Sequence, residues 1–291
     1  MEEDGSIFDL YFDLGHELDF KSDYLYHYRS LESLRSVFTE EGIFLRMTRA
    51  DCFQDKLEGK IIEDYYGEAL DDLLKQNIIS QDDYRELRQV TFSSEELFVL
   101  PRKGPITFTA MDKYDVFVVC FSTVKCGPDM FKAYGNSGPG KYCLELHSSM
   151  LDALCHHDYD ELSRTKLGRV LYGQEVVSYL KAIISSVMQQ NVLRENKSMI
   201  LADKLHELQY LAKDGSFNWE NEVRLIAYLP REYEKERKLY RRIENDDKHL
   251  LLNLGCYAVC RYWSSEGNRP KDNEEFIAML KERDYGYLID E

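Results

Sequence analysis

Residues 219–229 read WENEVRLIAYL, and their alternation of polar and apolar side chains decides how the chain is expected to fold. A period of two is typical of a β-strand with one face in the core. Four apolar side chains would share that buried face, namely Val223, Leu225, Ala227 and Leu229. Glu220, Glu222 and Arg224 would share the opposite face, with neighbours roughly 7 Å apart along the strand. Such a row forms either a solvated, ion-paired surface or the wall of a cleft.

Further strands are predicted outward from this one. Residues 116–121 (VFVVCF) are β-branched and aromatic, which indicates a buried strand. Residues 24–29 form a shorter aromatic strand, and Ser30 after them is a suitable N-cap for a helix that Gly42 would close. A strand over residues 43–47 is expected next.

Helical segments separate these strands. Residues 55–100 have a helical stripe and many acids, which predicts an inserted helical layer, and residues 174–212 are also mainly helical. The charged stretch 231–248 is expected to be a loop or a solvated helix. Because strands are scattered among helices without regular βαβ alternation, we predict a single α+β domain over 1–291, with a C-terminal extension from about 231 to 291.

Charge and cysteine content limit the classes of function. The formal net charge is −16, and an acidic surface repels nucleic acids and anionic membranes at long range. No run has the length and apolar character of a membrane span, and the first residues lack the apolar core of a secretory signal. Seven cysteines, an odd number without a dense framework, predict reduced thiols. We therefore expect a cytoplasmic protein with no membrane partner.

The first strand offers candidate binding residues. Leu25, His27 and Arg29 share one face, and Tyr26 and Tyr28 share the other. His27 titrates near neutral pH and can donate to a ligand hydroxyl, while Arg29 can hold a phosphate through two hydrogen bonds. The alternative is a partly buried strand end with a structural salt bridge.

More candidates follow the strand at 116–121. Ser122 lies at its end and suits either a ligand-facing edge or a simple turn. Met130, Phe131 and Tyr134 come next, at a spacing that is more typical of core than of a cofactor site. The cysteines and histidines lack a second ligand pair at zinc-binding spacing, so no metal is predicted.

Several short segments, taken in order, resemble the DUF2971 family of bacterial proteins, to which no activity is assigned. They are LYHYRSL at 25–31, DCFQD at 51–55 with Glu58, VCFS at 119–122, MFKAY at 130–134, and Lys213 with WENEVRLI at 219–226. The chain departs from the family's pattern at two places. Gln54-Asp55-Lys56 stands where the family usually has Asn-Asp-Pro, and Phe131 stands where it usually has Trp.

A looser resemblance is to ADP-ribosyltransferase-like folds, which carry His or Arg on a first strand, Ser or Tyr on a second, and Glu on a late strand. The matching residues here are His27 with Arg29, then Ser122 and Tyr134, then Glu220 and Glu222. This resemblance implies an ADP-ribosyltransferase-like mixed β-sheet core and NAD as the substrate, in a toxin or phage-defence effector.

The same resemblance implies a role for each residue. Glu222, with Glu220 beside it, would hold the ribose hydroxyls, stabilise the oxocarbenium-like transition state, or help deprotonate the acceptor. His27 would donate to a ribose hydroxyl. The other residues expected at the nucleotide are Tyr28, Ser122 at the ribose, Tyr134 at the nicotinamide, and Arg29 or Arg49 at the pyrophosphate.

Three functions stay open from the sequence. The first is an NAD-binding ADP-ribosyltransferase or NAD-cleaving enzyme whose acceptor is a protein or a nucleic acid. The second is a non-catalytic binding or regulatory module, in which the same charged residues form a structural ion-pair network. The third is a nuclease, which the net charge disfavours. Convergence of His27, Ser122 and Glu222 on an open cleft favours the first function, and burial under packed side chains favours the second.

Overall fold

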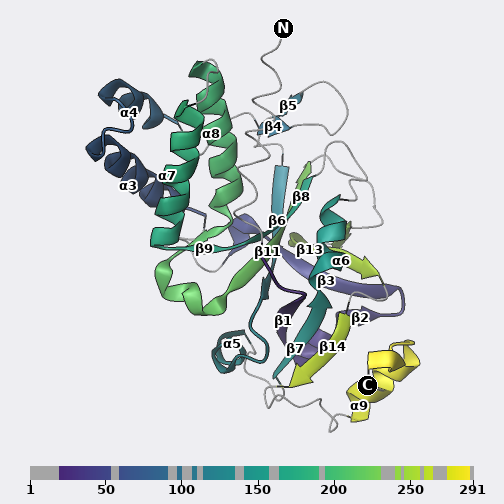
Figure 1. The fold of residues 1–291 in the computed structure, drawn as a ribbon. Helices are drawn as coiled ribbons and strands as arrows, with labels where there is room; N and C mark the ends of the chain where they lie inside the picture. Colours follow the sequence, from purple (N-terminus) through teal and green to yellow (C-terminus); the bar gives the residue numbers. More distant parts are fainter. Residues whose placement is uncertain are drawn as a thin grey trace.

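An antiparallel sheet of ten strands lies at the centre of the protein in the computed structural model (Figure 1). The structure describes residues 20–53, 59–90, 97–99, 107–109, 114–134, 141–156, 164–189, 194–230, 240–243, 246–255, 259–264 and 274–288. The strands of the sheet are β1 (Tyr24–Ser30), β2 (Phe38–Thr39), β3 (Gly42–Arg49), β6 (Tyr114–Ser122), β7 (Lys141–His147), β8 (Arg164–Arg169), β11 (Glu222–Pro230), β12 (Tyr240–Ile243), β13 (Asp246–Gly255) and β14 (Val259–Ser264).

The strand order is β12-β13-β3-β6-β1-β7-β14, with β11 between β6 and β8 and with β2 against β3. Two smaller pairs accompany this sheet. The parallel pair is β9 (Leu171–Tyr172) with β10 (Ala212–Lys213), and the antiparallel pair is β4 (Leu97–Val99) with β5 (Thr107–Thr109). Helices joined to a largely antiparallel sheet confirm the predicted α+β class.

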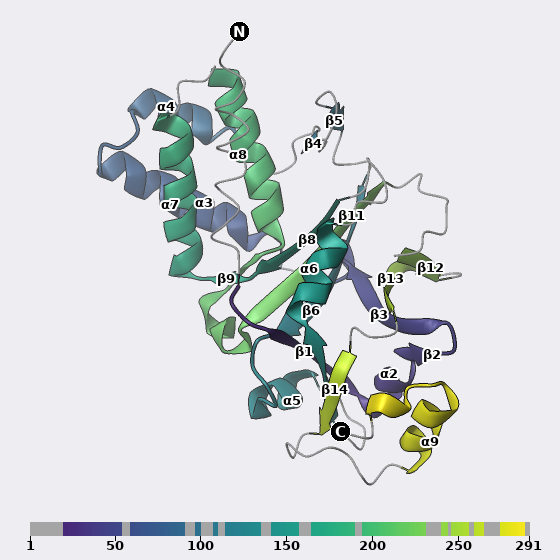
Figure 2. The ribbon, with the colours of Figure 1, turned by 45° about the vertical axis from the view of Figure 1, so that its right-hand side comes forward.

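Four of the described helices lie together beside the sheet, and the others are distributed around it. The helices described are α2 (Leu31–Arg35), α3 (Ile61–Lys75), α4 (Gln81–Leu87), α5 (Pro128–Tyr134), α6 (Ser148–His156), α7 (Gln174–Gln189), α8 (Arg194–Gln209) and α9 (Glu274–Glu282). Figures 1 and 2 place α3, α4, α7 and α8 together on one side, so the acidic segment 59–90 packs with α7 and α8 as one helical layer. The short 3₁₀ helices in the described ranges are η2 (Ala50–Cys52), η4 (Gly215–Glu220) and η5 (Gly286–Leu288). Of the helices in the described ranges, none combines the length and the apolar character needed to cross a membrane.

Strands β6 and β11 carry apolar residues on both faces, and each face packs into a different core. One core contains the four residues predicted to be buried, Val223, Leu225, Ala227 and Leu229, and also includes Phe276 and Leu280 of α9. The other takes Val116, Val118, Ile226 and Tyr228 and packs them under α3, α7 and α8. On this second face, the polar residues Glu222 and Arg224 precede Ile226 along β11. Glu222 and Arg224 therefore lie at the N-terminal end of β11, next to this second core.

The sheet forks at β6. Strand β11 pairs with β6 over its whole length, from Glu222 opposite Ser122 to Pro230 opposite Tyr114. The other edge of β6 is shared by two strands: β3 pairs with it at Val118 and β1 pairs with it at Ser122. Between these two positions β1 and β3 separate from β6. This fork is the opening in which the candidate site lies.

Some local predictions need correction. Ser30 caps α2 as expected, because its hydroxyl accepts from the backbone N–H of Ser33 at 3.3 Å. Gly42, however, does not close this helix. Phe38 and Thr39 already form β2, and Gly42 opens β3 at a φ of 143°, which a residue without Cβ adopts most easily. The glycine therefore serves a hairpin.

The C-terminal segment also differs from the prediction. Within the charged stretch 231–248, residues 240–243 form β12 and residue 246 begins β13, so the described part is strand and not loop or helix. Strand β12 lies at the edge of the sheet, where outward charged side chains stay in water. With β13, β14 and α9, this extension belongs to the same sheet and core.

Candidate functional site

A cavity of about 400 Å³ opens at the fork. Strands β1, β3, β6 and β11, helix α5, β10 and η4 all contribute to its wall. Its charged lining residues are Arg29, Arg46, Lys213, Arg224, Glu220 and Glu222. Four cations face two carboxylates, although the whole chain has a net charge of −16. The cavity is therefore a positive region within an acidic protein.

His27 fills the gap between the separating strands. Its Nδ1 lies 2.8 Å from the carbonyl oxygen of Cys120, and its Nε2 accepts a hydrogen bond of 2.7 Å from Nε of Arg29. Because a guanidinium can only donate, Nε2 must be the acceptor, so the proton sits on Nδ1 and is donated to Cys120. The imidazole thus takes the place of a neighbouring strand as the partner of this carbonyl group at the fork.

This geometry disagrees with the donor role expected of His27. Burial, and then the charge of Arg29, lower the pKa of His27 to about 3, so the ring is neutral at physiological pH. Both ring nitrogens already have partners within the protein. His27 therefore positions Arg29, and it has no hydrogen left for a ligand hydroxyl.

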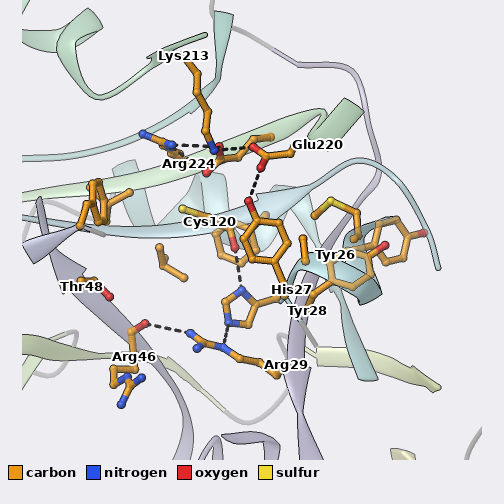
Figure 3. A pocket seen from close by; sticks show the side chains of 18 residues that line it. Tyr26, His27, Tyr28, Arg29, Arg46, Thr48, Cys120, Lys213, Glu220 and Arg224 are labelled. Carbon is orange, nitrogen blue, oxygen red and sulfur yellow. Dashed lines mark hydrogen bonds and ion pairs between the residues drawn. The ribbon is translucent and has the colours of Figure 1, made fainter. Parts of the chain in front are cut away.

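Arg29 forms one wall of the cavity together with Arg46. Nη2 of Arg29 reaches the carbonyl oxygen of Arg46 at 3.5 Å (Figure 3). Burial of the guanidinium, and then the nearby charge of Arg46, lower the pKa of Arg29 to about 10. Within the described ranges, no carboxylate forms an ion pair with either arginine. Arg29 is partly buried and Arg46 is exposed. Partial burial of a cation without a counter-charge is costly, and an anionic ligand would lower that cost at Arg29.

The opposite wall is a network of four charged side chains. Nζ of Lys213 bridges the two carboxylates, at 2.6 Å from Oε2 of Glu220 and 3.2 Å from Oε2 of Glu222. Arg224 donates to both oxygens of Glu222, from Nε at 2.8 Å and from Nη2 at 3.0 Å. A third bond runs from Nη1 of Arg224 to the carbonyl oxygen of Tyr210 at 2.8 Å. The charged row predicted from the alternation is thus a cavity wall as well as an ion-pair network.

The pKa values of the two carboxyl groups are shifted in opposite directions. Burial raises the pKa of Glu222, but the charges of Arg224 and Lys213 outweigh burial and bring the pKa down to about 2. For Glu220, burial dominates over the hydrogen bonds from Lys213 and Tyr134, so its pKa is raised above the ordinary value. Glu222 is consequently the fixed negative charge of the site, and Glu220 is the carboxyl group closer to taking up a proton.

Glu220 does not lie on the strand, which corrects the prediction for residues 219–229. It ends η4, a 3₁₀ helix capped by Asp214, whose carboxylate accepts from the N–H of Ser216 at 2.9 Å. Asn221 follows in the left-handed conformation, with φ 43° and ψ 52°, and β11 begins only at Glu222. This turn brings Glu220 and Glu222 to the same lysine from two different elements.

Ser122 is structural rather than open to a ligand, whereas Tyr28 lines the cavity but uses its hydroxyl within the protein. Ser122 is fully buried and does not line the cavity, and its hydroxyl donates to the carbonyl oxygen of Glu220 at 2.6 Å. The hydroxyl of Tyr28 donates to the carbonyl of Val124 and accepts from the N–H of Gly127 at 3.0 Å. The expected convergence on a cleft therefore holds for His27 and Glu222 but not for Ser122.

Tyr134 and Arg49 have opposite outcomes. Tyr134 lines the cavity from the end of α5, is 42% exposed, and donates its hydroxyl to Glu220. Arg49 is absent from the lining, and its Nε binds Asp51 at 2.7 Å instead. Arg46 takes the place on β3 that was expected for Arg49.

Arg46, Cys120 and Lys213 are among the lining residues that were not predicted as site residues. Lys213 is marked in the sequence only by the family resemblance. Its signal was a lysine shortly before two acids, but its reach to both needs the β9–β10 pair and the η4 turn. In the part of the chain that the structure describes, no group of His, Cys, Asp and Glu side chains is arranged to hold a metal ion.

Comparisons with known proteins give no further assignment. No protein-family model, curated protein or solved structure matches this chain. The resemblance to the DUF2971 family and to ADP-ribosyltransferase-like folds stays a prediction.

Proposed function

We propose that the cavity at the fork binds NAD as a substrate and that the protein cleaves it or transfers its ADP-ribose in the manner of an ADP-ribosyltransferase. The observation that carries this proposal is the wall of Arg29 and Arg46. These two cations line a cavity of a size common for small-molecule sites, and no described carboxylate neutralises them. A pyrophosphate supplies the missing negative charge and accepts bidentate hydrogen bonds from a guanidinium.

The opposite wall suits the chemistry at the ribose. Release of nicotinamide develops positive charge on the ribose, and a fixed anion next to it lowers the barrier. Glu222 stays ionised because Arg224 and Lys213 keep its pKa low. Glu220, whose pKa is raised, faces the exposed Tyr134 and is placed to exchange a proton with the group that attacks the ribose.

Nicotinamide release from NAD tests this proposal. The wild type is expected to release nicotinamide, and Glu222→Gln is expected to lower the rate by about 100-fold or more, as loss of a preorganised electrostatic group does. Glu63→Gln, at an exposed position of α3, is the matched control and is expected to keep the wild-type rate. Circular dichroism establishes that each variant is folded. A folded Glu222→Gln protein with an unchanged rate contradicts the mechanism.

A second candidate function is a non-catalytic module that binds an anionic ligand. It is favoured because both carboxylate oxygens of Glu222 already bind cations of the protein, namely Arg224 and Lys213. An ion-pair network of this kind can hold the wall in place without chemistry. If the wild type binds NAD but releases no nicotinamide, with or without an added acceptor, the result would favour this module over the enzyme.

A further inference from the structure

Cys120 occupies an unusual position on the cavity wall. It is the one exposed residue of β6, a strand whose other eight residues are buried or partly buried. Its register partner on β11 is Arg224, and its own carbonyl oxygen is the one that His27 caps at the fork. The fork thus uncovers this thiol inside the cavity.

Charged groups of both walls surround the thiol. Its S–H donates to Glu222, whose charge Arg224 and Lys213 balance. On the other side the partly buried guanidinium of Arg29 interacts favourably with a negative sulfur at Cys120. The bond to Glu222 favours the thiol, whereas the cation of Arg29 favours the thiolate that attacks disulfides.

The other cysteine side chains that the structure describes are less suited to such a reaction. Cys52 does not line the cavity, and burial, followed by its bond of 3.4 Å to Asp51, raises its pKa. Burial raises the pKa of Cys126 as well, and that of the fully buried Cys143 strongly. Cys155 donates to the carbonyl oxygen of Leu151 at 3.6 Å.

We propose that Cys120 is a modification site that forms mixed disulfides with small disulfides carrying carboxylate groups, the class to which glutathione disulfide belongs. Two observations carry this together: the exposed thiol in the cavity, and the partly buried Arg29, which lines the same cavity and donates to His27 and to the carbonyl of Arg46 but has no described carboxylate partner. Arg29 and Arg46 bind the carboxylates and bring the disulfide to the sulfur of Cys120. The proposal does not depend on any reaction at NAD.

The exchange needs no further oxidant. The sulfur of Cys120 attacks one sulfur of the small disulfide, a protein–small-molecule S–S bond forms, and the original S–S bond breaks. The departing thiolate takes up the proton that Cys120 loses, so one thiol and one disulfide are consumed and one of each is produced. The adduct fills the cavity and pairs its carboxylate with Arg29. A thiol reductant reverses the reaction and empties the cavity again.

Two disulfides of similar size and opposite charge test the proposal. The full chain is incubated at low salt with dithiodipropionate, which carries carboxylates, or with cystamine, which carries ammonium groups, and peptide mass spectrometry follows the adduct at Cys120. We expect dithiodipropionate to react about tenfold faster, since a cleft of one sign concentrates the opposite charge. The preference is expected to disappear in Arg29→Gln and to shrink at high salt.

Two control variants distinguish a reaction at Cys120 from general reactivity of the cysteines. Cys120→Ser is expected to form no adduct with dithiodipropionate under these conditions, while Cys52→Ser reacts like the wild type. Equal rates for the two disulfides in the wild type, or an adduct that forms first at another cysteine, would overturn the proposal. Because the salt dependence is measured on the wild type, the test holds even if Arg29→Gln does not fold.

Discussion

Arg224 is the side chain whose loss the fold should tolerate least. It is fully buried, and it gives two hydrogen bonds to Glu222 and one to Tyr210. Arg224→Met keeps most of the volume but leaves Glu222 buried with Lys213 as its remaining cation. Removing one partner of a buried ion pair costs about 3–5 kcal/mol, so we expect the free energy of unfolding to fall by about that amount.

Urea unfolding at neutral pH measures this change. The matched control is Arg241→Met, because Arg241 also pairs with an acid, Glu41, but the pair is exposed at 47% and 66%. An exposed pair contributes about 0–1 kcal/mol. The double variant Glu222→Gln/Arg224→Met removes both charges and is expected to be more stable than Arg224→Met alone.

The result that would refute this reasoning is a small effect. If Arg224→Met costs no more than Arg241→Met, the Glu222–Arg224 pair is not the buried network that the structure describes. If the double variant loses the sum of the two single losses, the two side chains are not coupled.

Three more predictions concern residues around the site. His27 has a folded-state pKa of about 3 against an ordinary 6.5, so the stability it contributes is complete above pH 6.5 and is lost as the pH falls towards 3. Between these pH values the free energy of unfolding should fall by about 1.4 kcal/mol per pH unit because of His27. Melting curves of the wild type and His27→Gln at a series of pH values should show this difference in pH dependence, and an equal pH dependence in the two proteins would contradict it. Asn221→Val is expected to destabilise by about 1–2 kcal/mol because a β-branched residue resists the left-handed turn, whereas Asn221→Gly should be nearly neutral in urea unfolding; equal losses would remove the turn argument. Phe121→Ala, at a buried position of β6, should cost about 3–5 kcal/mol by the same assay, and a loss below about 1 kcal/mol would mean that the core described around it is wrong.

Strand interiors were predictable from the sequence because local chemistry determines them. The alternation along β11 and the apolar run in β6 identify both strands, since a period of two and a run of β-branched side chains are each typical of strands. The cap at Ser30 is likewise local. Glu222 and Arg224 were placed on the correct common face by the same alternation.

The turn at Asn221 was not predictable by that pattern. The alternation extends through Glu220 in the sequence, although the strand does not. Asn is among the few residues that tolerate the left-handed conformation, so Asn221 was the one local sign of a break. The outcome, a carboxylate from η4 beside a carboxylate from β11, depends on Lys213 and therefore on tertiary structure.

The fork was out of reach of sequence reasoning for a different reason. Which residues of β1 and β3 meet β6 is a question of register between distant strands. Arg46 and Arg49 illustrate the consequence. Because side chains alternate, residues three apart on a strand face opposite ways, so only one of these arginines can line the cavity. The sequence offers no basis for choosing between them until β3 is registered against β6 and β13.

The central claim, that the arginine wall at the fork holds the pyrophosphate of NAD, is tested most directly by calorimetric titration of NAD into the wild type and Arg29→Gln. Arg85→Gln, at an exposed position of α4, serves as the control for the loss of one positive charge. A hydrogen bond to a charged group contributes about 1.5–3 kcal/mol, so we predict that NAD binds the wild type and Arg85→Gln alike and binds Arg29→Gln at least about tenfold more weakly. No binding to the wild type, or equal affinity for folded wild type and Arg29→Gln, would contradict the claim.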